Sequence, residues 1–193
     1  MKETLAIIGA LIGMLSVLPY IRDVLRRKSK PNIVSWATWT LLLGIGSAAA
    51  FAAHQPRSAL LTLGDAIATF SVVVLGLRFG IAKLSRFDAI CQVAAITGLI
   101  LWALFNSPAI AIIFAIVVDF AVSLPTLRHS WLKSFEETWQ TYAASSVAGV
   151  FTLASLNELK FSGWAFPLYL LLINAILAIT IIVGRRRLKT GVK

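Results

Sequence analysis

Long apolar stretches alternate with short polar or basic segments along the whole chain. A helix that crosses a membrane needs about 17–25 mostly apolar residues. Stretches of this kind lie at about 4–21, 33–53, 58–77, 88–105, 108–126, 138–156 and 161–184. The segments between them carry proline, asparagine or clustered charge, which are typical signals of a turn. The pattern therefore predicts an all-α membrane protein with seven transmembrane helices.

The composition supports a lipid environment and excludes several other classes. Hydrophobic residues make up 59% and charged residues 13% of the 193 residues, whereas a soluble domain has about 45–50% and about 25%. A disordered chain, a coiled coil and an ordinary soluble enzyme are therefore excluded. The first apolar stretch ends in a basic loop rather than at a small-residue cleavage site, so we interpret it as a retained helix.

The basic residues fall almost entirely on one side of the predicted helices. With seven crossings, one side carries 15 of the 18 Lys and Arg residues. The positive-inside rule then places the C-terminus in the cytoplasm and the N-terminus outside, and we expect the membrane to be the cytoplasmic membrane of a bacterium. Topology explains the net charge of +10, so we expect the lipid bilayer, and no nucleic acid, as the partner of these clusters.

Two parts of the chain read alike. Ser16–Arg22 resembles Val122–Arg128, with Pro19 aligned to Pro125, and each segment is followed by a basic loop. A pair of aromatic residues then opens the next predicted helix in each part: Trp36 with Trp39, and Trp139 with Tyr142. The ordered set of matches indicates an internal repeat.

The repeat predicts the architecture. Three crossings reverse the direction of the chain, so one additional crossing makes two three-helix units parallel. We therefore predict a first repeat over 1–86, a linker helix within 87–107 and a second repeat over 108–193 that includes the basic tail. Parallel repeats of this kind place a substrate site between the units near the bilayer midplane.

This 3+1+3 layout, with a proline near the inner end of the first and fifth helices and a basic loop after it, resembles the PQ-loop superfamily. Its members include the SWEET and SemiSWEET transporters. The motif is degenerate, because the Pro-Gln dipeptide is replaced by Pro19-Tyr20 and by Pro125-Thr126. The resemblance implies transport of a small polar solute by alternating access, and it implies that asparagines of the third and seventh helices face each other across the pocket.

Three strongly polar residues lie inside the predicted membrane helices: Asp65, Asp119 and Asn174. A charge at this depth costs about 2.5–3.5 kcal/mol, so such residues are functional candidates. Asn174 fits the family asparagine directly, and Asp65 takes the other position as a carboxylate. We predict that Asp65 and Asn174 bind substrate and that Asp65 and Asp119 couple transport to protons. The alternative is a structural hydrogen bond between helices.

Aromatic residues and prolines complete the candidate site. Trp36, Trp39, Trp139 and Tyr142 are predicted to stack on the solute, with a membrane-interface belt as the alternative explanation. Proline removes a backbone hydrogen bond and permits a bend. We therefore predict hinges at Pro19 and Pro125, with a plain helix end as the alternative.

No catalytic or nucleotide-binding motif occurs in the sequence. Cys91 is the single cysteine, and His54 and His129 are predicted to lie on opposite faces, so we expect no metal site, no cofactor and no enzymatic activity. The function that these observations favour is a transporter of a sugar, an amino acid, a nucleoside or a vitamin, with proton coupling as a hypothesis. The alternative is a receptor or accessory subunit of the same fold. A second copy of the chain, in a homo-oligomer, is also a candidate partner.

Overall fold

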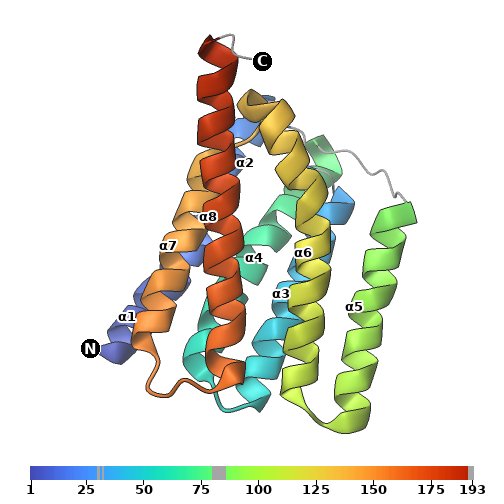
Figure 1. The fold of residues 1–193 in the computed structure, drawn as a ribbon, viewed down its shortest axis with the longest axis vertical. Coiled ribbons are helices and arrows are strands. Elements are labelled where there is room, and N and C mark those ends of the chain that lie inside the picture. The colour runs from blue at the N-terminus through green and yellow to red at the C-terminus, as the bar shows by residue number, and fades with distance from the viewer. Residues whose placement is uncertain (30, 32, 80–85, 191–193) are drawn as a thin grey trace.

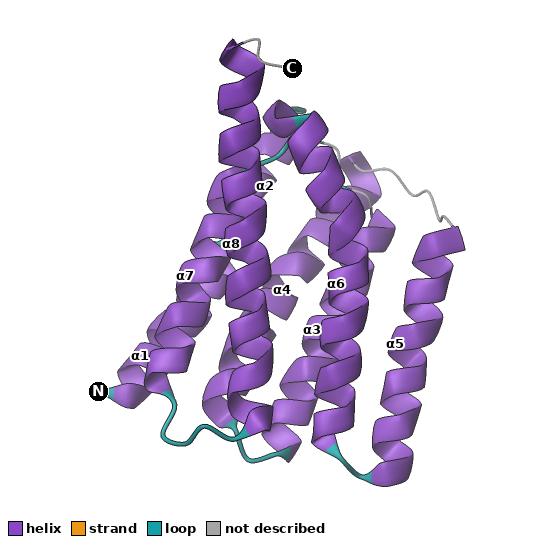
Figure 2. Ribbon diagram, viewed as in Figure 1, coloured by secondary structure: helices purple, strands orange, loops and turns teal. Residues whose placement is uncertain are grey.

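The computed structural model describes residues 1–29, 31, 33–79 and 86–190. Every regular element in this part of the chain is helical, and it contains no strand (Figure 2). The predicted all-α class is therefore confirmed. Part of the basic loop expected after the third helix, at 80–85, and the last residues of the basic tail, at 191–193, lie outside the described residues.

A helix lies at each of the predicted positions. The helices are α1 (Lys2–Leu15), α2 (Leu18–Leu25), α3 (Ile33–Ala52), α4 (Pro56–Phe79), α5 (Arg86–Phe105), α6 (Pro108–Leu132), α7 (Trp139–Ser155) and α8 (Phe161–Thr190), with a short 3-10 turn, η1 (Ser134–Glu136), before α7. Helices α6 and α8 run nearly two turns further than predicted. Figure 1 shows the long helices side by side, with the C-terminus of α8 at one end of the bundle and the N-terminus near the other.

Among the described residues, five helical segments are long and apolar enough to cross a membrane. They are Lys2–Leu25, which contains α1 and α2, and the helices α3, α4, α6 and α8. These segments support an integral membrane protein, as the sequence predicts. Helices α5 and α7 run alongside them but do not belong to this set.

The first apolar stretch forms two helices instead of one. Helix α1 ends at Leu15, and Pro19 lies in the first turn of α2. Proline has no backbone N–H to donate, so the helical hydrogen-bond ladder is interrupted at this point. The corresponding Pro125 lies inside the continuous helix α6. The two predicted hinge prolines therefore occupy different backbone settings.

Each of α4 and α8 packs most extensively against two neighbours. Helix α4 contacts α1 and α3, and α8 contacts α6 and α7. Contacts of α1 with α7 and of α3 with α6 join the two groups, and α5 packs mainly on α6 (Figure 1). Small residues permit the close approach: a Cβ on Gly64 of α4 would lie 2.7 Å from the backbone oxygen of Ala10 of α1.

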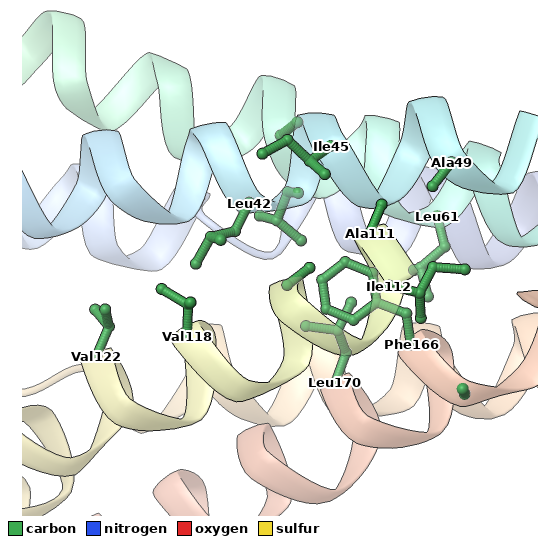
Figure 3. Close-up of a cluster of buried hydrophobic side chains, with 14 of the residues drawn as sticks. Leu42, Ile45, Ala49, Leu61, Ala111, Ile112, Val118, Val122, Phe166 and Leu170 are labelled. Atoms are coloured by element: carbon green, nitrogen blue, oxygen red, sulfur yellow. The ribbon is translucent and has the colours of Figure 1, made fainter. Parts of the chain in front are cut away.

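The largest buried apolar cluster lies where α3, α6 and α8 meet (Figure 3). Phe166 of α8 is only 1% exposed and packs against Gly46 of α3, and Leu42, Ala111 and Ile112 surround it. This cluster fills the bundle toward the end that holds Met1. We call this end the N-terminal end, and the opposite end, where α2, η1 and the end of α8 lie, the basic end (Figure 1).

Candidate functional site

A cavity of about 80 Å³ lies inside the bundle, between the apolar cluster and the basic end. One water needs about 10–15 Å³ of such space, so the cavity can hold several waters or a small solute. Its wall comes from helices of both groups. The polar lining residues are Ser16, Asp65, Thr69, Asp119, Ser123, Thr141, Ser145 and Asn174, and the aromatic ones are Trp36, Trp39 and Tyr142.

Most of the predicted site residues meet at this one cavity. The third-helix and seventh-helix candidates, Asp65 of α4 and Asn174 of α8, both line it, and Asp119 of α6 does as well. Three of the four predicted aromatic residues join them. The fourth, Trp139, lies outside the lining set and packs against the apolar residues Ile181 and Leu177 of α8 and their neighbours.

Asp65 is buried, with 7% of its surface exposed. Its Oδ1 atom is buried and has no hydrogen-bond partner among the described residues. The same oxygen lies against Gly13 of α1, where an added Cβ would be 2.6 Å away. Burial of a carboxylate without a partner costs several kcal/mol, because no interaction compensates for its desolvation. Asp65 is therefore a candidate ligand-binding group of the cavity.

Asp119 has the opposite environment, although it is equally buried. The Tyr169 hydroxyl of α8 donates to Asp119 Oδ2 at 2.5 Å, and the Ser123 hydroxyl, one turn along α6, donates to the same oxygen at 3.4 Å. These hydrogen bonds hold the Asp119 carboxyl group in place. The fold thus supplies Asp119 with donors, whereas Oδ1 of Asp65 has none among the described residues.

Asn174 and the aromatic residues form the remaining wall. The Asn174 side-chain amide donates to the Leu170 backbone oxygen of its own helix at 2.8 Å. The rings of Trp36 and Trp39 meet edge to face, with centroids 5.2 Å apart. Tyr20 packs on the other side of Trp36 at 4.7 Å. The mutual packing fixes the orientation of the indole rings at the cavity wall.

Sequence reasoning missed the small hydroxyl residues of the wall. The Ser145 hydroxyl of α7 donates to the Ser16 hydroxyl at 2.9 Å, which bridges the two helix groups at the break between α1 and α2. The Thr40 hydroxyl of α3 donates to the Thr69 hydroxyl of α4 at 3.0 Å. Serine and threonine are common in membrane helices, so composition carries no signal for them. The position of Ser16, three residues before Pro19, was the available clue.

Hydrogen bonds close the bundle at the basic end. The Thr138 hydroxyl donates to Asp23 Oδ2 at 2.7 Å, and the Ser29 hydroxyl donates to the Glu136 backbone oxygen at 3.0 Å. Arg185 of α8 donates to the Glu137 backbone oxygen at 2.6 Å. The first two bonds link the segment around α2 to the segment between α6 and α7, and the third links that segment to α8.

Glu137 is the titratable group within this network. Burial raises the pKa of Glu137 from 4.5 to about 7, and the nearby Glu136 adds to the rise, whereas a hydrogen bond from the Tyr142 hydroxyl opposes it. That bond measures 3.3 Å. Since Tyr142 lines the cavity, the ionisation of Glu137 acts on a residue of the cavity wall.

The N-terminal end is also cross-linked. The Lys2 ammonium donates to the Leu156 backbone oxygen at 2.7 Å, and Arg57 donates to the Ser155 backbone oxygen at 2.8 Å. Both bonds join the first helix group to the end of α7. With the apolar cluster below the cavity, the structure has contacts between the two groups on both sides of the site.

Within the described residues, no group of three His, Cys, Asp or Glu side chains could hold a metal ion. In the part of the chain that the structure describes, no lysine or arginine lines the cavity. No family model, no curated protein and no solved structure matches the chain. The chemistry of the site therefore rests on its own geometry.

Proposed function

We propose that the chain is a transporter of a small polar solute that works by alternating access between two three-helix units of PQ-loop type. The first unit contains α1–α4, in which α1 and α2 together count as one span. The second unit contains α6–α8, and α5 is the linker. The observation that carries the proposal is the central cavity, where residues from both helix groups meet. Two acids, an asparagine and three aromatic rings line it, as the resemblance implies for a solute site between repeats.

The pattern of helix contacts supports a parallel repeat. In each unit the last helix packs against both others. Between the units, the first helix of one contacts the second helix of the other: α1 contacts α7, and α6 contacts α3. Any twofold relation between two copies produces such reciprocal pairing, and the single extra crossing α5 makes the two units parallel rather than inverted.

We propose that α5 and α7 also cross the membrane, which gives seven spans. At a rise of about 1.5 Å per residue, the 20 residues of α5 and the 17 residues of α7 approach the thickness of the hydrocarbon core, about 30 Å. The positive-inside rule then places the basic end in the cytoplasm and the N-terminal end outside, in the cytoplasmic membrane of a bacterium.

Alternating access requires that the contacts at one end break while those at the other persist. At the basic end, the bond between Thr138 and Asp23 spans the two units. At the N-terminal end, the bonds of Lys2 and Arg57 to the end of α7 do the same. Pro19 and Pro125 are the proposed hinges at the basic end, and Asp65 and Asp119 are the proposed sites of proton coupling.

Counterflow into liposomes tests transport directly. The purified chain is reconstituted with an excess of unlabelled solute inside, and uptake of labelled sugars, amino acids, nucleosides and vitamins is measured. We expect transient accumulation of one class, its loss in Asp65→Asn and Asn174→Ala, and its retention in Glu3→Gln, an exposed acid near the N-terminus. Folded protein that accumulates no solute would instead favour the receptor or accessory subunit.

A further inference from the structure

The cavity has an unusual charge for this protein. The chain carries 18 basic and 8 acidic residues, yet two of the acids line the cavity and no lysine or arginine among the described residues does. Lys2, Arg57, Arg185 and Arg187 all donate to backbone oxygens close to the two ends of the bundle. Charge of one sign, surrounded by low-dielectric walls, selects a ligand of the opposite sign.

The two carboxylates are not equivalent partners for such a ligand. Asp119 already accepts hydrogen bonds from Tyr169 and Ser123, so its position is fixed by the protein. Asp65 is buried at the cavity wall, and its Oδ1 accepts none from the described residues. A desolvated carboxylate is stabilised when a cation pairs with it. The acid with an unpartnered oxygen is thus Asp65, and Asp119 is a second acidic group whose position is fixed.

The rest of the wall indicates which kind of cation fits. A metal ion such as Mg²⁺ or Ca²⁺ requires about six oxygen ligands, and the described residues contain no cluster of three acidic or ligating side chains. The wall instead presents the aromatic side chains of Trp36, Trp39 and Tyr142 together with aliphatic groups. Aromatic faces attract ammonium groups and pack against alkyl carbon at the same time.

We propose that the solute of this cavity is an organic cation, with an ammonium group that pairs with Asp65 and lies against the aromatic wall of Trp36, Trp39 and Tyr142. This inference rests on the proposed function, because the bound cation is taken to be the transported solute. Asp119 holds the electrostatic potential of the cavity negative without a direct bond to the ligand. A sugar or another neutral solute would leave Asp65 without a counter-charge.

Matched probes of equal shape test the charge preference. Choline is compared with its neutral carbon analogue, in which a tert-butyl group replaces trimethylammonium, and with the anion tert-butylacetate. Butylammonium and butanol form a second pair. Equilibrium binding to the purified full chain is measured together with the thermal shift. We expect each cation to bind at least about tenfold more tightly than its neutral analogue, because one charged contact contributes about that much to the affinity.

Substitutions test whether Asp65 and Trp39 cause the preference for cations over their neutral analogues. Asp65→Asn should lower the ratio of choline affinity to neutral-analogue affinity by about tenfold. Glu158→Gln removes an acid that is exposed and pairs with Lys160, and it should leave the ratio unchanged. If Asp65→Asn fails to fold, Trp39→Leu provides the second measurement, since loss of the indole face should lower the ratio several-fold.

The outcomes separate this inference from the proposed function. Neutral analogues that bind as tightly as the cations, or an unchanged ratio in Asp65→Asn, would overturn the organic-cation assignment even if counterflow of a neutral solute is observed. Binding of cations without counterflow of labelled choline or butylammonium would leave the site assignment intact and overturn transport. Absence of binding by both cations overturns the inference as well.

Discussion

Gly13 of α1 lies directly against the carboxylate of Asp65 of α4, so that a Cβ at position 13 would be 2.6 Å from Oδ1. No side chain other than hydrogen fits there without displacing the acid or the helix. Overpacking of this kind costs about 1–3 kcal/mol. The glycine therefore sets the position of the one carboxylate at the cavity wall that lacks a donor.

The first prediction follows from this contact. Gly13→Ala should reduce solute counterflow at least about tenfold and lower the unfolding free energy by about 1–3 kcal/mol, because the new methyl group moves the Asp65 carboxylate. Gly44→Ala is the matched control, since a Cβ there meets no atom within 4 Å, and alanine favours the helix by about 1 kcal/mol. Equal counterflow in both variants would show that the Gly13 contact has no role in the site.

The second prediction concerns the donor to Asp119. Tyr169→Phe removes the hydroxyl that donates to Asp119 Oδ2 and leaves a buried acceptor, which costs about 1–3 kcal/mol. Ser123→Ala should cost less, since its hydrogen bond is longer, at 3.4 Å. A double-mutant cycle with Asp119→Asn, followed by thermal unfolding, measures the coupling. A coupling energy near zero would contradict a structural role for the Tyr169 hydroxyl.

The third prediction is a dependence of stability on pH at the basic end. The pKa of Glu137 is raised from 4.5 to about 7, so between these values the folded chain holds a proton that the unfolded chain has released. Stability therefore rises as the pH falls from about 7.5 to 5, by at most about 3 kcal/mol. Melting temperatures of the purified chain across this range provide the measurement.

The Glu137→Gln variant should lose this dependence and should be more stable than the parent chain above pH 7. His129 requires a separate control, because its Nε2 lies 3.3 Å from Glu136 Oε2 and 3.9 Å from Glu137 Oε1. The His129→Gln variant should retain the rise in stability on acidification. If the rise disappears in His129→Gln and persists in Glu137→Gln, the assignment to Glu137 is wrong.

The fourth prediction concerns the repeated aromatic residues. It distinguishes a role at the cavity wall from a role at the membrane interface. Trp39 lines the cavity, whereas Trp139 packs against α8 outside it. Trp39→Phe should weaken solute binding several-fold with little change in melting temperature, because a smaller ring remains at the wall. Trp139→Phe should leave solute binding unchanged. Equal losses of binding in the two variants would favour a shared role at the membrane interface.

The sequence predicts the helices because lipid imposes a strong rule: an apolar stretch of sufficient length must satisfy its own backbone hydrogen bonds. The same rule makes an intramembrane carboxylate conspicuous, so Asp65 and Asp119 could be found without a structure. The difference between the environments of the two carboxylates could not be found from the sequence. Whether a carboxylate meets a glycine or a tyrosine depends on the rotation of each helix about its axis, which tertiary packing determines.

The different positions of Trp39, at the cavity wall, and Trp139, against α8, could not be predicted from the sequence for the same reason. An aromatic residue near a helix end has the same local pattern whether it faces a cavity or a neighbouring helix. The break between α1 and α2 was only partly predictable. Pro19 and Pro125 have similar sequence contexts, yet one begins a new helix and the other lies within a continuous one. Steric environment, which one sequence does not encode locally, decides between these outcomes.

The separation of α1 from α2 gives the two halves of the protein unequal mechanical properties. The 8 residues of α2 form a short rigid lever with a joint at its base, whereas the matching part of α6 continues the helix from which it rises. Asp23, the acceptor of the Thr138 bond, lies on α2, so a turn of α2 about this break would move the contact that joins the two helix groups at the basic end. In the proposed transporter, such a movement would open the basic end by a local rearrangement, with the second unit as its frame.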